Sequence, residues 1–173
     1  RIDPARTPLE SYMAGNYPQW KRSELAKRRW VFALVKDYQL TQVAVLDYTS
    51  DGRKYKFTMP IDCLRPLRGK QTEWVQRGRH IYSSYSTLYI DYIRNAPESD
   101  FDTLFNDVLS AAIGMKSCEY VNQSAAKKAD AKEAYTMAVR EAGQANAYVI
   151  GPEDVGPVDD ELTWEEARIN GGI

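Results

Sequence analysis

The sequence predicts an α+β fold. We expect an antiparallel helical bundle with a small antiparallel β-subdomain inserted between the first and later helices, plus an extended C-terminal arm. Three observations predict it. Strand-like alternation is confined to residues 38–94, helical periodicity lies on both sides of it, and composition changes after residue 150. At 173 residues the chain has the length of one domain with a real core.

The first 20 residues contain Pro4, Pro8, Gly15 and Pro18, a composition typical of an extended arm or short helical turns. We therefore assign 1–20 to an N-terminal arm.

Residues 21–35 are predicted to form a helix, because apolar positions from Trp20 to Ala33 recur at an approximately helical spacing. Its bases lie between Trp20 and Trp30, an arrangement suited to nucleic acid or an acidic partner, although a solvated face is the simpler interpretation. These bases are Lys21, Arg22, Lys27, Arg28 and Arg29.

The middle of the chain, residues 38–94, is predicted to be β. An apolar run over 40–48 is followed by Asp51-Gly52, a hairpin turn pair, and by clean alternation over 53–59 that ends at Pro60. A second hairpin is expected around Gly78. A further strand over 88–93 has apolar residues at both parities and is expected to be covered on both faces.

Between these strands, residues 65–72 are expected to form a polar loop. Arg65, Arg68 and Lys70 lie in it and could face phosphates or a partner, although such a run more often is simply solvated.

Two helices are predicted over residues 100–122 and 124–148. Ser99 or Asp100 is expected to cap the first at Phe101, and apolar residues from Phe101 to Ile113 follow the i, i+3, i+4, i+7 pattern. In the second, mostly small residues recur at 4-3-4-3-4 spacing, which predicts close packing on the first helix as an antiparallel pair. That seam comprises Ala131, Tyr135, Ala138, Ala142, Ala145 and Val149.

After two Gly-Pro pairs, residues 151–173 form an acidic arm. The net charge of the whole chain is −1, but residues 149–173 contain seven acids and one base, whereas the first 36 residues contain eight bases and three acids. Apolar residues interrupt the acidic run, which predicts docking with Trp164 as anchor and the acids facing a basic surface. The alternative is that the arm folds back on its own domain. The docking residues are Asp159, Asp160, Glu161, Leu162, Trp164 and Ile169.

No catalytic, metal or cofactor site is expected. The chain lacks a glycine-rich phosphate loop, its one histidine, His80, falls in a predicted hairpin, and Cys63 and Cys118 are too few for a disulfide framework. The paired acids lie in the acidic arm, where nothing apolar would raise a pKa. No apolar run approaches the ~18 residues of a membrane span, so no membrane partner is expected.

Five motifs follow one another along the chain in the same order as in a known family, which they resemble. They are Trp30-Val31-Phe32-Ala33 at a helix end, an aromatic strand leading to 59–65, a strand-turn-strand over 76–83, a strand over 88–93 entering the next helix, and an Ala-rich last helix. In this order, across 25–150, the chain resembles the head-to-tail adaptor proteins of short-tailed bacteriophages, the tail tubular protein A-like family.

The resemblance implies a structural virion protein without cofactor or catalytic residues, made in the host cytoplasm and located at the head-tail interface. Such adaptors form a ring, usually a dodecamer, that joins the portal protein to the tail nozzle protein around the passage for double-stranded DNA. In related adaptors a C-terminal arm grips the portal, a role the resemblance gives to Asp159–Ile169 here. The loop at 65–72 is the expected nozzle-facing side.

Two alternatives remain open at the level of sequence. One is a small DNA-binding module that uses the basic N-terminal helix, which would show salt-dependent affinity for duplex DNA. The other is an enzyme such as a cell-wall hydrolase, for which the sequence offers no acid in an apolar cleft.

Overall fold

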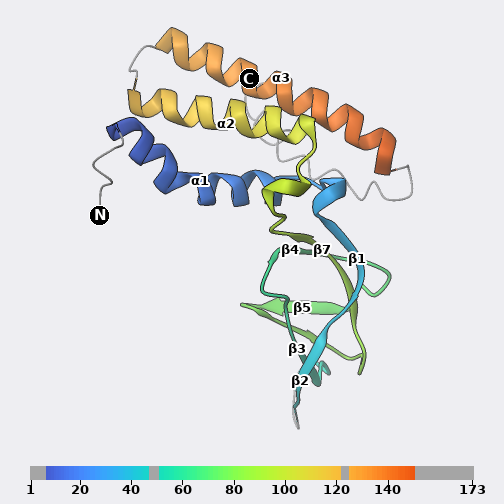
Figure 1. Ribbon diagram of the computed structural model, residues 1–173. Coiled ribbons are helices and arrows are strands. Elements are labelled where there is room, and N and C mark those ends of the chain that lie inside the picture. The colour runs from blue at the N-terminus through green and yellow to red at the C-terminus, as the bar shows by residue number, and fades with distance from the viewer. Residues whose placement is uncertain (1–6, 47–50, 122–124, 151–173) are drawn as a thin grey trace, which may run out of the picture.

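The computed structural model describes residues 7–46, 51–121 and 125–150, and mixes helices with antiparallel sheets. In this described part the helices are α1 (Pro8–Lys27), α2 (Thr103–Val121) and α3 (Ala125–Ile150), with short 3-10 turns η1 (Val31–Ala33) and η2 (Glu98–Asp100). Helix α2 packs between α1 and α3, and the strands lie on the side of α1 away from α3 (Figure 1).

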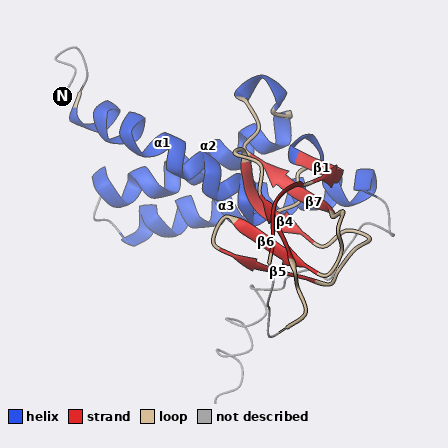
Figure 2. Cartoon of the chain, turned by 90° about the horizontal axis from the view of Figure 1, so that it is seen from below, coloured by secondary structure: helices blue, strands red, loops and turns tan. Residues whose placement is uncertain are grey.

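Two antiparallel sheets follow one another along the β part. One has the order β1-β7-β4, formed by β1 (Leu34–Gln39), β7 (Tyr89–Arg94) and β4 (Cys63–Leu67). The other has the order β2-β3-β6-β5, formed by β2 (Thr41–Val45), β3 (Tyr55–Thr58), β6 (His80–Ser83) and β5 (Trp74–Arg77). Figure 2 shows these strands gathered at one end of the helical layer.

Helix α1 begins at Pro8, so the expectation of an N-terminal arm over residues 1–20 is wrong for residues 8–20. Thr7 and Glu10 form a capping box, in which the Glu10 amide donates to Thr7 Oγ1 at 3.3 Å and the Thr7 amide donates to Glu10 Oε2 at 2.7 Å. Pro8 occupies the first turn, where its missing N–H costs nothing. Residues 8–20 are therefore helical, even though Pro18 lies inside the helix.

The far end of α1 also differs from the predicted helix over 21–35. The helix ends at Lys27, and Arg28 is extended at φ −136° and ψ 163°. Trp30 then turns back, and its indole Nε1 donates to the Glu24 carbonyl at 3.1 Å, which satisfies a carbonyl near the helix end. The chain continues through η1 into β1, so Leu34 and Val35 lie in a strand.

The hairpins lie where the turn residues predict them. Strand β2 pairs with β3 on either side of Asp51-Gly52, and β5 pairs with β6 around Gly78; both glycines have positive φ, 74° and 62°. Phe57 and Met59 are buried in the alternating segment, and β3 stops before Pro60.

Strand β4 was not predicted, because Cys63–Leu67 falls in a segment expected to be a turn and then a polar loop. It contains Pro66, which is tolerated since β4 is an edge strand of its sheet. Arg65 therefore lies in a strand and is half-buried, which corrects its placement in the 65–72 loop.

Helix α2 begins later than predicted. Asp102, rather than Ser99 or Asp100, caps it, because the Phe105 amide donates to Asp102 Oδ1 at 2.6 Å. Phe101 precedes the helix, and its ring lies edge-on to Phe105 at 4.6 Å. Ala142 of α3 is fully buried against α2, with Tyr135 and Ala138 partly buried beside it, as the small-residue seam predicts.

Two buried clusters meet at β7. Ile93 belongs to the cluster under the helices, which includes Leu25, Trp30 and Phe105. Ile90 and Tyr92 belong to the cluster inside the β part. Tyr92 and Ile93, adjacent in β7, thus point into different cores, whereas Tyr89 is 40% exposed. The expected cover on both faces of residues 88–93 is therefore found at Ile93 but not at Tyr89.

Trp30 is expected to be the most costly residue of the helical core to truncate. It is 1% exposed and lies edge-on to Phe105 at 4.9 Å. Trp30→Ala should lower the free energy of unfolding by about 3–5 kcal/mol, whereas Trp30→Phe should cost less because it keeps an aromatic ring. Urea denaturation measures both; equal losses would show that the ring itself adds little.

Candidate functional site

The basic residues around the end of α1 do not form one open face. Lys21 Nζ lies 3.7 Å from Glu98 Oε1 and 5.8 Å from the centre of the Phe101 ring. Lys27 Nζ donates to Glu24 Oε1 at 2.8 Å and to Tyr135 Oη at 3.1 Å. Both lysines are therefore held by partners within the fold.

The arginines of the same cluster point to different places. Arg22 is exposed, and Arg28 and Arg29 are half-buried. Arg28 Nη1 lies 3.6 Å from the position that a Cβ at Gly143 would occupy, so this guanidinium lies against α3. The Arg29 carbonyl accepts a hydrogen bond from Asn146 Nδ2. Lys27 and Arg28 thus connect the end of α1 to α3, while Lys21 is paired with Glu98, so the cluster does not present five free charges to a polyanion.

Glu24 is the centre of this junction. Its side chain is 2% exposed, and its two oxygens accept from Lys27 Nζ and, at 2.9 Å, from Tyr135 Oη. Burial raises the pKa of Tyr135. Burial is the largest single effect on Lys27 and would lower its pKa, but the hydrogen bonds to Glu24 and Tyr135 and the charges of these two groups together outweigh it and raise that pKa. Glu24 is thus a paired structural acid, which sequence periodicity could not distinguish from a surface charge.

Arg68 and Lys70 follow β4 and are exposed. The Arg68 guanidinium carbon lies 5.9 Å from the centre of the Trp74 ring, and Lys70 Nζ lies 3.2 Å from Asp37 Oδ2. Arg65 lies apart from them in the strand. Two of the three predicted loop bases are therefore exposed, and each of them has a contact within the fold, Arg68 with Trp74 and Lys70 with Asp37.

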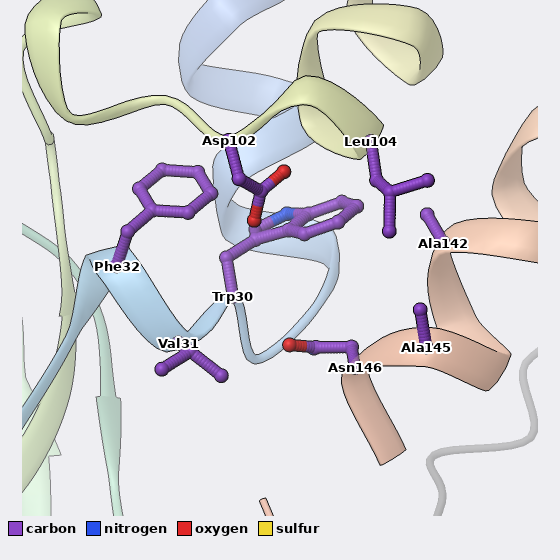
Figure 3. A pocket seen from close by; sticks show the side chains of 8 residues that line it. All are labelled: Trp30, Val31, Phe32, Asp102, Leu104, Ala142, Ala145 and Asn146. Atoms are coloured by element: carbon purple, nitrogen blue, oxygen red, sulfur yellow. The ribbon is translucent and has the colours of Figure 1, made fainter. Parts of the chain in front are cut away.

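An apolar groove lies where η1, α2 and α3 converge, and encloses about 320 Å³ (Figure 3). Trp30, Val31 and Phe32 form one side of it, and Leu104 with Ala142 and Ala145 forms the other. Asp102 and Asn146 add polar atoms at its edge. Val31 is 42% exposed, which is unusual for an apolar residue beside a core tryptophan. Sequence reasoning did not identify this groove, although Trp30–Ala33 was noted as a motif.

The predicted docking residues, Asp159, Asp160, Glu161, Leu162, Trp164 and Ile169, lie outside the described residues. Val149 of the predicted seam ends in the last turn of α3, where side chains are also outside the described set.

Within the described residues, no group of three or more His, Cys, Asp and Glu side chains is placed to hold a metal ion. Cys63 and Cys118 are free thiols in β4 and α2. None of the described helices is both long enough and apolar enough to cross a bilayer.

No protein-family model matches the chain, and a search of curated proteins returns no match.

The Tyr135 hydroxyl should matter more to stability than an exposed base of the same cluster. Tyr135→Phe removes one of the two partners of a buried carboxylate and should cost about 1–3 kcal/mol of unfolding free energy. Arg22→Gln, on the exposed side of α1, should stay within about 0.5 kcal/mol of the parent chain. Thermal or urea unfolding compares the two, and an equal effect would contradict the role given to Glu24.

Cys63 should make stability fall at high pH. Burial, with the Asp62 carboxylate nearby, raises the pKa of its thiol from 9.0 to about 11, so the folded chain favours the protonated form. The resulting stability is complete below pH 9 and is lost as pH rises towards 11. Urea midpoints measured from pH 8 to 11 should decline less in Cys63→Ala than in the parent. Parallel curves would refute the assignment, while Cys118→Ala serves as the matched control.

Proposed function

We propose that this chain is a structural virion protein, a head-to-tail adaptor whose ring joins the portal vertex to the tail nozzle and lines the DNA passage. The observation that supports it is the order of the motifs across residues 25–150, which resembles that of the tail tubular protein A-like family. The element order of helix, β part and two further helices is compatible with it. The proposed ring is a homo-oligomer, by resemblance a dodecamer, at the head-tail interface of the virion.

The finer architecture belongs to the same proposal. In it, α1, α2 and α3 act as an antiparallel bundle, the strands as an inserted subdomain, and 151–173 as an arm. Packing of α2 against both other helices supports the bundle, and the position of all strands between α1 and α2 in the sequence supports the insertion.

Subunit contacts of a ring require exposed apolar surface, and the described part offers it. Large apolar side chains are unusually exposed on β2 and nearby: Val43 is 50% and Val45 57% exposed. Ile61, in the turn after β3, is 94% exposed, and Met137 on α3 is 65% exposed. These four residues lie on β2, in the turn after β3 and on α3, and exposed apolar residues of this kind are compatible with an interface although single ones are common on any surface.

The two ends of the molecule receive different partners in this proposal. Arg68 and Lys70, exposed beside β4, face the nozzle protein. Asp159, Asp160, Glu161, Leu162, Trp164 and Ile169 face the portal protein, with Trp164 filling an apolar pocket and the acids meeting bases on its rim. Arg22, the exposed base of α1, lies near packaged DNA or a neighbouring subunit.

The test of the proposal is assembly. Electron microscopy of the full chain mixed with a portal protein of the same phage should show rings seated on the portal. A chain ending at Gly151 should lose portal binding, and Trp164→Ala should weaken it by at least about tenfold, as is usual for a central aromatic anchor. Lys128→Gln, at an exposed residue of α3 that has no part in the proposal, leaves the arm intact and is the matched control.

Three results would contradict this function. They are no ring under any condition, unchanged portal affinity after truncation, or duplex DNA binding by a monomer with a steep dependence on salt. The last result would favour the DNA-binding module.

A further inference from the structure

The groove between η1 and α3 is apolar, open on one side and unfilled by any described residue. Its lining includes Trp30, Val31, Leu104 and Ala145, and Figure 3 shows Trp30, Leu104 and Ala145 around a common space. An open apolar surface of this shape is stabilised when a large apolar side chain from another segment fills it.

The chain itself supplies a segment of matching chemistry. Residues 151–173 follow directly after α3, and Asn146, which lines the groove, lies one helical turn, about 5.4 Å, before Ile150. Trp164 is 14 residues beyond Ile150, a contour length of up to about 46 Å when extended, which is ample for a return to the groove.

A base beside the groove can pair with an acid of the same segment. The Arg28 guanidinium lies against α3 at Gly143, between two wall residues, and the Arg29 backbone is bonded to Asn146. Trp164 is preceded by Asp159, Asp160 and Glu161 and followed by two glutamates. One acid, Asp102, also borders the groove, and its Oδ1 accepts from the Phe105 amide.

We propose that in the free protein the acidic segment around Trp164 binds the groove of its own chain, with the indole between Val31 and Ala145. A tethered segment has a high effective concentration, about millimolar, at a site so near its attachment, which favours its own groove over that of a second copy. The contact goes beyond the adaptor function, and only the displacement of the segment by a portal rests on that function.

Intrinsic fluorescence of the full chain tests the contact directly. The other three tryptophans, Trp20, Trp30 and Trp74, are 7%, 1% and 9% exposed, so acrylamide should discriminate Trp164 from them. In the parent chain we expect no readily quenched component. Ala145→Glu adds bulk and a like charge to the groove and should create such a component, which Trp164→Phe in the same background should abolish.

Two variants complete the design. Val31→Glu, on the opposite wall, should also expose Trp164, which guards against a folding defect specific to Ala145→Glu. Ala126→Glu, at an exposed alanine near the start of α3, is the matched control and should leave quenching unchanged. Far-UV circular dichroism checks that each variant keeps its helices.

The outcomes separate clearly. The proposal would be overturned if the parent chain already showed a quenchable component that Trp164→Phe removes. It would also be overturned if protection of Trp164 disappeared on dilution, because the segment would then occupy the groove of a second copy. Protection that is independent of concentration and lost in both groove variants supports it. Because no portal is present, failure here would leave the adaptor function standing.

Discussion

Burial of Trp30 at the junction of helices and strands is the constraint on which the remaining structure depends. Its indole donates to the Glu24 carbonyl, ends α1 and lies edge-on to Phe105 of α2. With Trp30 fixed, Ala33 is also buried and the chain leaves directly into β1. The same packing leaves Val31 at the surface and so forms one wall of the groove.

A second set of contacts fixes how the strands meet the helices. Arg94, at the end of β7, donates through Nη2 to the Phe32 carbonyl at 3.0 Å and to Asp100 Oδ2 at 2.6 Å. It therefore links η1, η2 and β7 at one point. Because Ile93 lies in one core and Tyr92 in the other, the described sheets cannot rotate against the helices without exposing buried side chains.

Local chemistry made part of this fold predictable and left other parts hidden. The hairpins are determined locally, by the alternation of apolar and polar residues before Pro60 and by the glycines at two turns, and do not depend on residues distant in sequence. The α1 start was also encoded locally, in Thr7 and Glu10, but the prolines of that segment obscured it. Strand β4 could not be predicted because it forms by pairing with β7, far along the chain, and contains a proline. The sequence could not show that Lys21 and Lys27 are paired within the fold, because their partners Glu98 and Tyr135 are distant along the chain.

In the two proposals Trp164 binds either the groove of its own chain or a portal protein. The two sites therefore compete for the same side chain, and the difference between their binding free energies can be bounded. The effective concentration of the tethered segment is about millimolar. A dissociation constant for the groove only modestly below this concentration is enough to hold the segment in the free chain. A portal pocket that binds the same indole with micromolar affinity gains about 4 kcal/mol over a millimolar groove contact. Weak intramolecular binding would thus cover an exposed tryptophan before assembly, while leaving the segment free to exchange on contact with its partner. The apolar, shallow wall made by Val31 and Ala145 is of the kind that gives such weak binding, since it offers few hydrogen bonds.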